Sequence, residues 1–423
     1  MVHQIYRRNL DKCWNCGFCT ETVSCPSPQV CIGCQACYLA CYREAIEPIE
    51  QKNKPEITII VDEQPVSVPS QVTIKTALET LGIRFSRFPH STDIFAPCQT
   101  GGCFSCLVLV DGKILRSCHM PVKAGQQVKT KLPEDFIPHR IVGWYSPHPV
   151  GGVGTPWSAK NFGRSRFSYI EVACFTAGCN LRCKTCQNFD TTYNSRAPAV
   201  TPHEASETLT RLRKRYRVNR LAISGGEPTL NRRWLTQFFS ELKSLNPDSD
   251  ARLHLDTNAS ILTPDYIDEL VLAGITDIGP DLKAVQLATY QIITGITDPS
   301  LARQYLETSW AAVKYIADHY YPDQIFMGVG LPYNAAFFSS SDQKETELHE
   351  WGARLSAIDD HIQVCILDYR PTFRRLDITR PSVEEIRHVK QLLEGIGLKT
   401  VIAQTKLGHL PPIQPAPDRL KHQ

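Results

Sequence analysis

The sequence predicts an α/β protein with a largely parallel sheet, preceded by two small cysteine-rich modules. Strand-like and helix-like runs alternate between residues 166 and 410, and repeated βα units imply a parallel sheet. Fifteen of the 17 cysteines fall into three groups with the spacing of metal ligands. At 423 residues, the chain is long enough for several domains and a large core.

The expected elements of the C-terminal part follow from hydrophobic periodicity. The expected strands are 169–174, 221–224, 253–256, 277–282, 325–330, 364–368 and 399–403. The expected helices are 204–216, 234–245, 264–273, 301–319, 345–358 and 383–393.

Composition excludes several classes of protein. The net charge is +3 and 21% of residues are charged, which favours neither nucleic acid nor an anionic membrane as partner. No apolar run reaches the length of about 18 residues that a membrane span needs. Arg7 and Arg8 are not followed by the apolar segment of a secretory signal, so we expect a cytoplasmic protein. Cysteines in such a chain are metal ligands rather than a disulfide framework.

Residues 1–52 contain two C-x2-C-x2-C groups, each followed by a further cysteine. This pattern resembles a bacterial two-cluster ferredoxin, in which the fourth cysteine of each group binds the other cluster. The resemblance implies one [4Fe–4S] cluster on Cys13, Cys16, Cys19 and Cys41, and a second on Cys25, Cys31, Cys34 and Cys37. The gap from Cys25 to Cys31 is shorter than in such ferredoxins, and Tyr42 replaces the usual proline. Two zinc-binding knuckles are the alternative.

Residues 53–135 carry a third group of cysteines, Cys98, Cys103, Cys106 and Cys118. C-x4-C-x2-C with a distant fourth cysteine is the plant-type [2Fe–2S] spacing, and Gly101 and Gly102 allow the backbone to curl around a cluster. Short strands at 57–61 and 66–68, a helix at 73–81 and a hairpin turn at Asp111-Gly112 resemble a β-grasp ferredoxin domain. A zinc ribbon is the alternative. Each cluster of the two modules has four cysteines, so we interpret them as electron carriers.

A loop after the strand at 168–174 carries Cys179, Cys183 and Cys186 at C-x3-C-x2-C spacing. Thiolates are the soft ligands that iron–sulfur clusters require. Three ligands for a four-iron cluster leave one iron open, and an open metal position is where a substrate binds. The loop therefore predicts a reactive cluster, the third [4Fe–4S] cluster of the chain.

This loop and the later Ser224-Gly225-Gly226-Glu227-Pro228 resemble the radical S-adenosylmethionine (radical SAM) superfamily. The stretches 186–191, 256–258 and 281–283 resemble those of pyruvate formate-lyase activating enzymes, although Thr185 stands where an aromatic residue is usual. The resemblance covers residues 166–405 and implies a partial (βα)6 TIM-like barrel, with chemistry at the carboxyl ends of the strands.

The resemblance also implies contacts to SAM. Glu227 is expected to accept a hydrogen bond from the SAM ammonium. Asp256 and Thr257 would lie beside the SAM carboxylate, with or without a monovalent cation, and a helix N-cap is the alternative for Asp256. Lys283 would pair with that carboxylate. The expected cofactor-binding residues are Asn188, Gly225, Gly226, Glu227, Asp256, Thr257, Asp281, Lys283 and Arg370.

The chain is expected to divide into three domains with sites, joined by a linker and followed by a tail that carry none. The expected domains are 1–52, 53–135, a Pro/Gly-rich linker at 136–165, the barrel at 166–410 and a Pro-rich tail at 411–423. Cys174 and Cys365 stand alone in strand-like runs and are expected to be buried apolar residues.

The resemblance implies an enzyme that reductively cleaves SAM to a 5′-deoxyadenosyl radical, which abstracts a hydrogen atom. An external low-potential donor would supply electrons through the N-terminal clusters. A glycyl-radical enzyme is the substrate suggested by the activating enzymes. Radical chemistry on a small molecule or a peptide is one alternative. An electron-transfer protein without catalysis is another.

Overall fold

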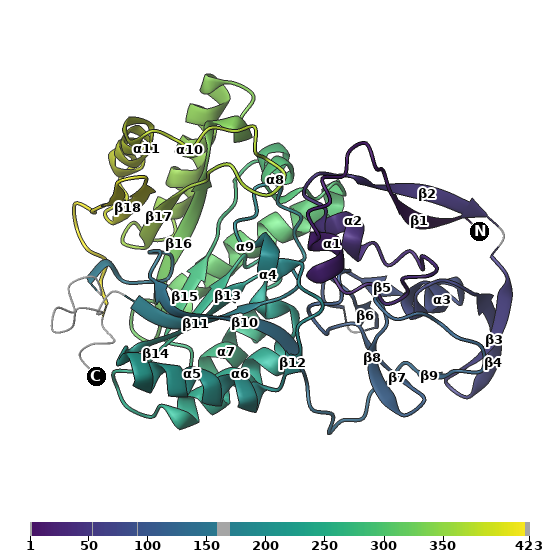
Figure 1. Cartoon of the computed structure of the whole chain (residues 1–423). Coiled ribbons are helices and arrows are strands. Elements are labelled where there is room, and N and C mark those ends of the chain that lie inside the picture. The colour runs from purple at the N-terminus through teal and green to yellow at the C-terminus, as the bar shows by residue number, and fades with distance from the viewer. Residues whose placement is uncertain (1, 53, 91, 159–169, 419–423) are drawn as a thin grey trace. The chain divides into compact units, whose positions relative to one another are not determined.

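The computed structural model describes residues 2–52, 54–90, 92–158 and 170–418, which form two compact units (Figure 1). The first unit comprises Met1–Gly143, Thr176–Asn180 and Asn188–Thr201. The second comprises Trp144–Phe175, Leu181–Gln187 and Pro202–Gln423. No helix of the described residues is long and apolar enough to cross a membrane.

The N-terminal part of the first unit is closed by two antiparallel strands, β1 (Val2–Arg8) and β2 (Ile46–Lys52). Between them lie the short helices α1 (Phe18–Glu21) and α2 (Ala36–Ala40). Both helices begin after a residue in the left-handed conformation, so each helix follows a sharp turn of the cysteine-bearing loop.

The second part of the first unit is a mixed five-stranded sheet in the order β4-β3-β9-β7-β8, covered by the helix α3 (Ile74–Thr80). The strands are β3 (Glu56–Val61), β4 (Gln64–Pro69), β7 (Leu107–Val110), β8 (Lys113–Arg116) and β9 (Gln127–Lys129). Ile74, Ala77 and Leu78 of α3 pack on the apolar face of the sheet. Asp111 and Gly112 have φ of 48° and 76°, so the hairpin turn expected there forms. The β-grasp architecture is confirmed.

The second unit is built around a sheet whose strands follow one another in chain order from β11 to β18, except for β12 (Ala199–Val200), which pairs with β10 (Arg140–Pro149). The pairings from β13 to β18 are parallel. The strands are β11 (Ile170–Thr176), β13 (Arg220–Gly225), β14 (Arg252–Thr257), β15 (Asp277–Pro280), β16 (Phe326–Tyr333), β17 (Gln363–Asp368) and β18 (Val401–Thr405). The order of a βα barrel is therefore present, and the predicted fold class is confirmed.

Helices connect the parallel strands, as the sequence predicts. They are α5 (Pro202–Tyr216), α6 (Arg232–Leu245), α7 (Pro264–Leu272), α8 (Leu287–Thr294), α9 (Pro299–His319), α10 (Ser341–Ser356) and α11 (Val383–Ile396). Of these, α8 was not predicted from the sequence. Each buries one apolar stripe: α6, for example, buries Trp234, Leu235, Phe238, Phe239 and Leu242. Burial of these side chains stabilises the helices more than their intrinsic propensity does.

The segment expected to be a linker is partly structured. Residues 140–149 form the strand β10 (Arg140–Pro149), which lies next to β11 in the sheet. Beyond it, Gly154 N donates to Gly328 O at 2.9 Å, and Gln363 donates to Gly152 O at 2.8 Å and to Thr155 O at 2.6 Å. Residues 152–155 are thus hydrogen-bonded to the barrel strands. Residues 159–165 of the expected linker lie outside the described residues.

The Pro-rich tail also contacts the second unit. Thr400 donates to Gln414 O at 2.8 Å, and Arg252 pairs with Asp418 at 3.1 Å. The tail is therefore ordered against the barrel as far as residue 418.

Candidate active site and cluster sites

Glu227 follows the carboxyl end of β13 and is fully buried. Its Oε1 accepts hydrogen bonds from Thr229 N at 3.0 Å, from the Thr229 hydroxyl at 2.6 Å and from the Thr257 hydroxyl at 2.7 Å. Its Oε2 accepts from Asn258 N at 2.7 Å. Burial raises the pKa of Glu227, and the hydrogen bonds from Thr229, Asn258 and Thr257 oppose this shift. The carboxyl group thus joins the end of β13 to the end of β14.

The hydrogen bond that Glu227 is expected to accept from the SAM ammonium stays a prediction, and the geometry adds a positioning role for this carboxylate. Replacing Glu227 with alanine would leave the buried donors of Thr229 and Asn258 without this acceptor. Each buried donor left unsatisfied costs about 1–3 kcal/mol. We therefore expect Glu227→Ala to lower the thermal unfolding midpoint, followed by circular dichroism, whether or not SAM is present. A variant as stable as the wild type that binds SAM poorly would instead assign Glu227 to the ligand alone.

Lys283, Asp281, Cys183 and Tyr369 lie close together in the second unit. Lys283 is buried, and its Nζ donates to Asp281 Oδ2 at 2.6 Å. Burial alone would lower the pKa of Lys283, but the charges of Asp281, Tyr369 and Cys183 raise it well above its usual value. Burial raises the pKa of the Cys183 thiol to about 12, and nearby Lys283 opposes that shift. The arrangement keeps a charged ammonium near Cys183, which is a predicted cluster ligand.

Alternate residues of β14 form a buried ionic network. His254 Nε2 lies 3.0 Å from Asp256 Oδ1, and its Nδ1 lies 3.5 Å from Glu171 Oε2. Asp277, which is fully buried, pairs with Arg220 at 3.0 Å and with Arg252 at 2.7 Å. This network was not predicted from the sequence. Its signal was the polar alternation at residues 252, 254 and 256 within a strand-like run, which places these side chains on one face.

The network predicts a pH-dependent stability. Burial lowers the pKa of His254, but Asp256 and Glu171 outweigh it and raise the pKa from 6.5 to about 9. A raised folded-state pKa contributes stability that is fully present below pH 6.5 and is lost as the pH rises through about 9. Relative to His254→Gln, we expect an advantage of up to ~3 kcal/mol near pH 6 that shrinks towards pH 9.5. Denaturant titrations at several pH values test this, and a pH-independent difference would contradict it.

The other predicted cofactor residues are placed as follows. Gly225 ends β13 with φ of 106°, a conformation that glycine adopts without strain, and Gly226 follows it. Thr257 ends β14. Asn188 precedes the short helix α4 (Phe189–Thr192) in the first unit. Arg370 follows β17 and is exposed.

The N-cap alternative for Asp256 is wrong. Asp256 lies inside β14, and the cap of the next helix, α7, is Thr263. Its carboxylate instead pairs with His254. Cys174 and Cys365 are fully buried in the second unit, as expected of apolar residues.

The β-grasp domain brings its four cysteines together. All four are buried, and the Cys98 thiol is within hydrogen-bonding reach of Cys103 and Cys118. The Cys106 thiol reaches Cys118 in the same way. Arg116 Nη1 donates to Gly101 O at 2.7 Å and fixes the loop between the first two cysteines. Four converging sulfurs in a glycine-bearing loop fit a [2Fe–2S] cluster.

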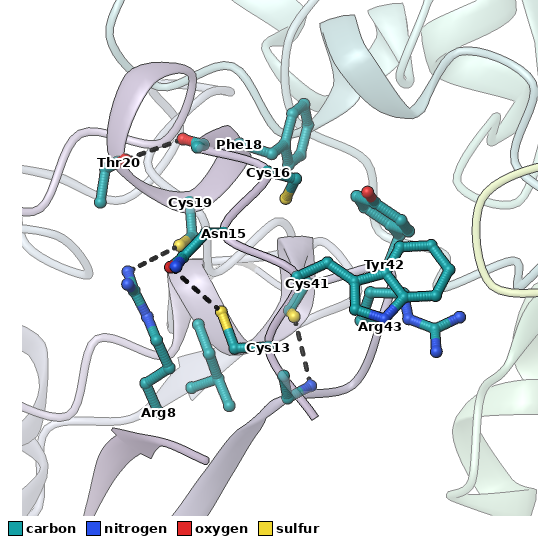
Figure 2. A pocket seen from close by; sticks show the side chains of 14 residues that line it. Arg8, Cys13, Asn15, Cys16, Phe18, Cys19, Thr20, Cys41, Tyr42 and Arg43 are labelled. Atoms are coloured by element: carbon teal, nitrogen blue, oxygen red, sulfur yellow. Dashed lines mark hydrogen bonds between the residues drawn. The ribbon is translucent and has the colours of Figure 1, made fainter. Parts of the chain in front are cut away.

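A cavity in the N-terminal module is lined by Cys13, Cys16, Cys19 and Cys41 (Figure 2). Its volume is about 220 Å³. Arg8 Nη2 donates to Cys19 Sγ at 3.4 Å, and the Arg43 guanidinium lies 3.5 Å from the ring centroid of the exposed Trp14. The cavity joins the fourth cysteine, Cys41, to the first group of three, which is the grouping expected of one cluster.

The other four cysteines of this module also gather. Burial raises the pKa of Cys34 to about 12, with further effects from Cys25 and Cys31. Burial likewise raises the pKa of Cys37 to about 12, with Cys34, Cys31 and Cys25 adding to it. A metal centre would replace the thiol protons and bind these cysteines as thiolates, so the donor set fits the second predicted cluster.

Comparison with known proteins identifies two regions. Residues 174–336 match the family description "Radical SAM superfamily", and residues 54–133 match "2Fe-2S iron-sulfur cluster binding domain". The chain is 28% identical over 168 residues to the pyruvate formate-lyase-activating enzyme of Streptococcus mutans, covering 38% of this chain and 59% of that one. It is 30% identical over 133 residues to the GTP 3′,8-cyclase of Bradyrhizobium diazoefficiens, covering 31% and 38%.

Another relative is matched over most of its own length. The chain is 33% identical over 87 residues to the hydrogen cyanide synthase subunit HcnA of Pseudomonas protegens, covering 20% of this chain and 80% of that one. The chain covers only 59% and 38% of the lengths of the activating enzyme and the cyclase. With the barrel order, these matches show that the chain carries a radical SAM domain, preceded by a 2Fe–2S iron–sulfur cluster binding domain.

Proposed function

We propose that this radical SAM enzyme cleaves SAM reductively and uses the resulting 5′-deoxyadenosyl radical to abstract a hydrogen atom. Cys179, Cys183 and Cys186 would hold a [4Fe–4S] cluster, which supplies the electron and an open iron for SAM. The observation that carries the proposal is the buried ammonium of Lys283, paired with Asp281 and close to Cys183. A fixed cation beside the cluster loop is suited to the SAM carboxylate.

The residues around this ammonium set the pose of SAM. Asp281 orients Lys283, and Glu227 fixes the backbone at Asn258. Asp256 already has a charged partner in His254. A monovalent cation at Asp256 would therefore share the carboxylate with His254.

Anaerobic assay with SAM and dithionite tests the chemistry. We expect 5′-deoxyadenosine and methionine in equal amounts by chromatography. Absence of both from protein with its full iron content would overturn the proposal and favour an electron-transfer protein.

For the substrate, we propose a glycyl-radical enzyme, on the similarity to pyruvate formate-lyase-activating enzyme. An external low-potential donor would supply the electrons. Incubation with a glycyl-radical enzyme, SAM and reductant should produce the electron paramagnetic resonance (EPR) doublet of a glycyl radical. Without that doublet, but with 5′-deoxyadenosine formed, a small molecule becomes the favoured substrate; the similarity to GTP 3′,8-cyclase supports this second candidate. Replacing the glycyl-radical enzyme with GTP and following its consumption tests it.

A further inference from the structure

The peptide around Cys179 is held against the [2Fe–2S] loop, and both belong to the first unit. A Cβ built on Gly102 would lie 2.7 Å from Gly178 N, and one built on Gly178 would lie 2.7 Å from Cys103 N. Gly178 directly precedes Cys179, and Gly102 directly precedes Cys103. The two cysteine-bearing backbones are therefore in contact, with no room for a side chain between them.

Conformation alone does not require glycine at residue 102. Gly178 has φ of 81°, where glycine is favoured, but Gly102 is not among the residues with positive φ. Other residues could adopt the backbone conformation of Gly102. Only the approach of Ala177 and Gly178 excludes a side chain there.

A second contact holds the other side of Cys179. Arg87, which follows β5 (Phe85–Ser86) in the β-grasp domain, donates from Nη2 to Asn180 O at 2.6 Å. Asn180 directly follows Cys179. The domain that carries Cys98, Cys103, Cys106 and Cys118 thus fixes the residues on both sides of Cys179.

The N-terminal module contacts the segment after the cysteine loop through aromatic side chains. The rings of Phe18 and Phe189 have centroids 5.6 Å apart, and Phe189 lies three residues beyond Cys186. An electron that took this route would pass through the two aromatic side chains and through the gap between them. Electron tunnelling weakens steeply with distance and most steeply across gaps, so the backbone contact at Gly102 is the better route.

We propose that the [2Fe–2S] centre is the immediate electron donor to the cluster at Cys179, across the contact between Gly102 and Gly178. One electron leaves the reduced [2Fe–2S] centre, which is oxidised, and the [4Fe–4S] centre is reduced by that electron. A low-potential one-electron donor such as reduced flavodoxin then restores the [2Fe–2S] centre. Arg87 is a positioning residue for this transfer. The inference rests on the proposed cysteine ligands of the preceding section, but not on cleavage of SAM.

Freeze-quench EPR on the full chain with all clusters tests the route. The protein is mixed anaerobically with limiting reduced flavodoxin, without SAM, and frozen at successive times. The EPR signal of the [2Fe–2S] centre persists at higher temperature than those of [4Fe–4S] clusters. Subtracting the spectrum of the Cys183→Ala variant isolates the signal of the cluster at Cys179. The added methyl group of Gly102→Ala would push the two backbones apart. Because a displacement near 1 Å strongly slows a reaction between closely positioned groups, that signal should appear about tenfold more slowly or slower still. Iron content and visible absorption should not change.

Matched variants keep the test decisive. Gly395→Ala, in open space on α11, should behave as wild type. Arg87→Met leaves the [2Fe–2S] loop untouched and should also slow transfer. An unchanged rate in both Gly102→Ala and Arg87→Met, or a rate slowed only by Phe18→Leu, would overturn the proposal. If transfer occurs as expected but no 5′-deoxyadenosine forms with SAM, the proposed function fails and the electron route stands.

Discussion

Replacing Cys183 with alanine is expected to abolish cleavage of SAM. A [4Fe–4S] cluster with an open iron has three protein ligands, and two cysteines cannot hold it. We expect production of 5′-deoxyadenosine to fall by more than about a hundredfold. Removing a residue that only hydrogen-bonds to a metal ligand already lowers metal affinity or activity by about 10–100-fold. Iron analysis should show a loss of about four atoms per chain, while the [2Fe–2S] absorption remains.

Cys365→Ala is the control for this variant. Cys365 is fully buried in β17 and is not one of the predicted ligands, so the control should keep both its iron and its activity. Full activity in Cys183→Ala would contradict the ligand assignment of the cysteine loop.

Replacing Lys283 with methionine is expected to weaken SAM binding strongly. Methionine keeps much of the side-chain volume but removes the ammonium and leaves the Asp281 carboxylate without its partner at 2.6 Å. The variant would also lose the proposed ion pair between Lys283 and the SAM carboxylate. Losing one member of a buried charge pair across an interface costs about 2–5 kcal/mol, so the Kd for SAM should rise by roughly 30-fold or more. Anaerobic equilibrium dialysis with labelled SAM measures this change.

Two further variants separate charge from structure. Lys283→Arg keeps the charge and should lose less affinity than Lys283→Met. Lys314→Met removes an exposed lysine of α9 that pairs with Asp318 and should bind SAM as the wild type does. Equal affinity in wild type and Lys283→Met would show that the ammonium serves Asp281 alone.

Local patterns were sufficient to predict the barrel and the cysteine groups. The strands and helices of the second unit have strong hydrophobic periods, and burial of one face follows directly from such a period. The cysteine groups were predicted from ligand spacing, which is also a local property. Lys283 and Asp281 were predicted through family resemblance, and the structure places them in contact.

Long-range pairing could not be predicted in the same way. β10 contains Pro147 and Pro149, and prolines argue against a strand unless it lies at an edge or has partners that tolerate them. The pairing of His254 with Glu171 joins residues 83 positions apart, and nothing in either local sequence specifies the other. The contact of Arg87 with Asn180 spans 93 positions. Such contacts depend on the assembled sheet.

The segment from β10 to Thr155 determines how far the chain can be truncated from its N-terminus before the barrel fails to fold. A truncated protein that starts at residue 166 would lack β10 and the peptide that bonds to Gly328 and Gln363. It would also remove Gly154 O and the Thr155 hydroxyl, which accept hydrogen bonds from the buried Arg220 at 3.2 Å and 3.0 Å. Arg220 would keep its ion pair with Asp277 but lose two buried hydrogen-bond acceptors, which is destabilising. We therefore expect the smallest radical SAM fragment able to fold by itself to begin no later than residue 140, well ahead of Cys179, the first cysteine of the predicted cluster loop.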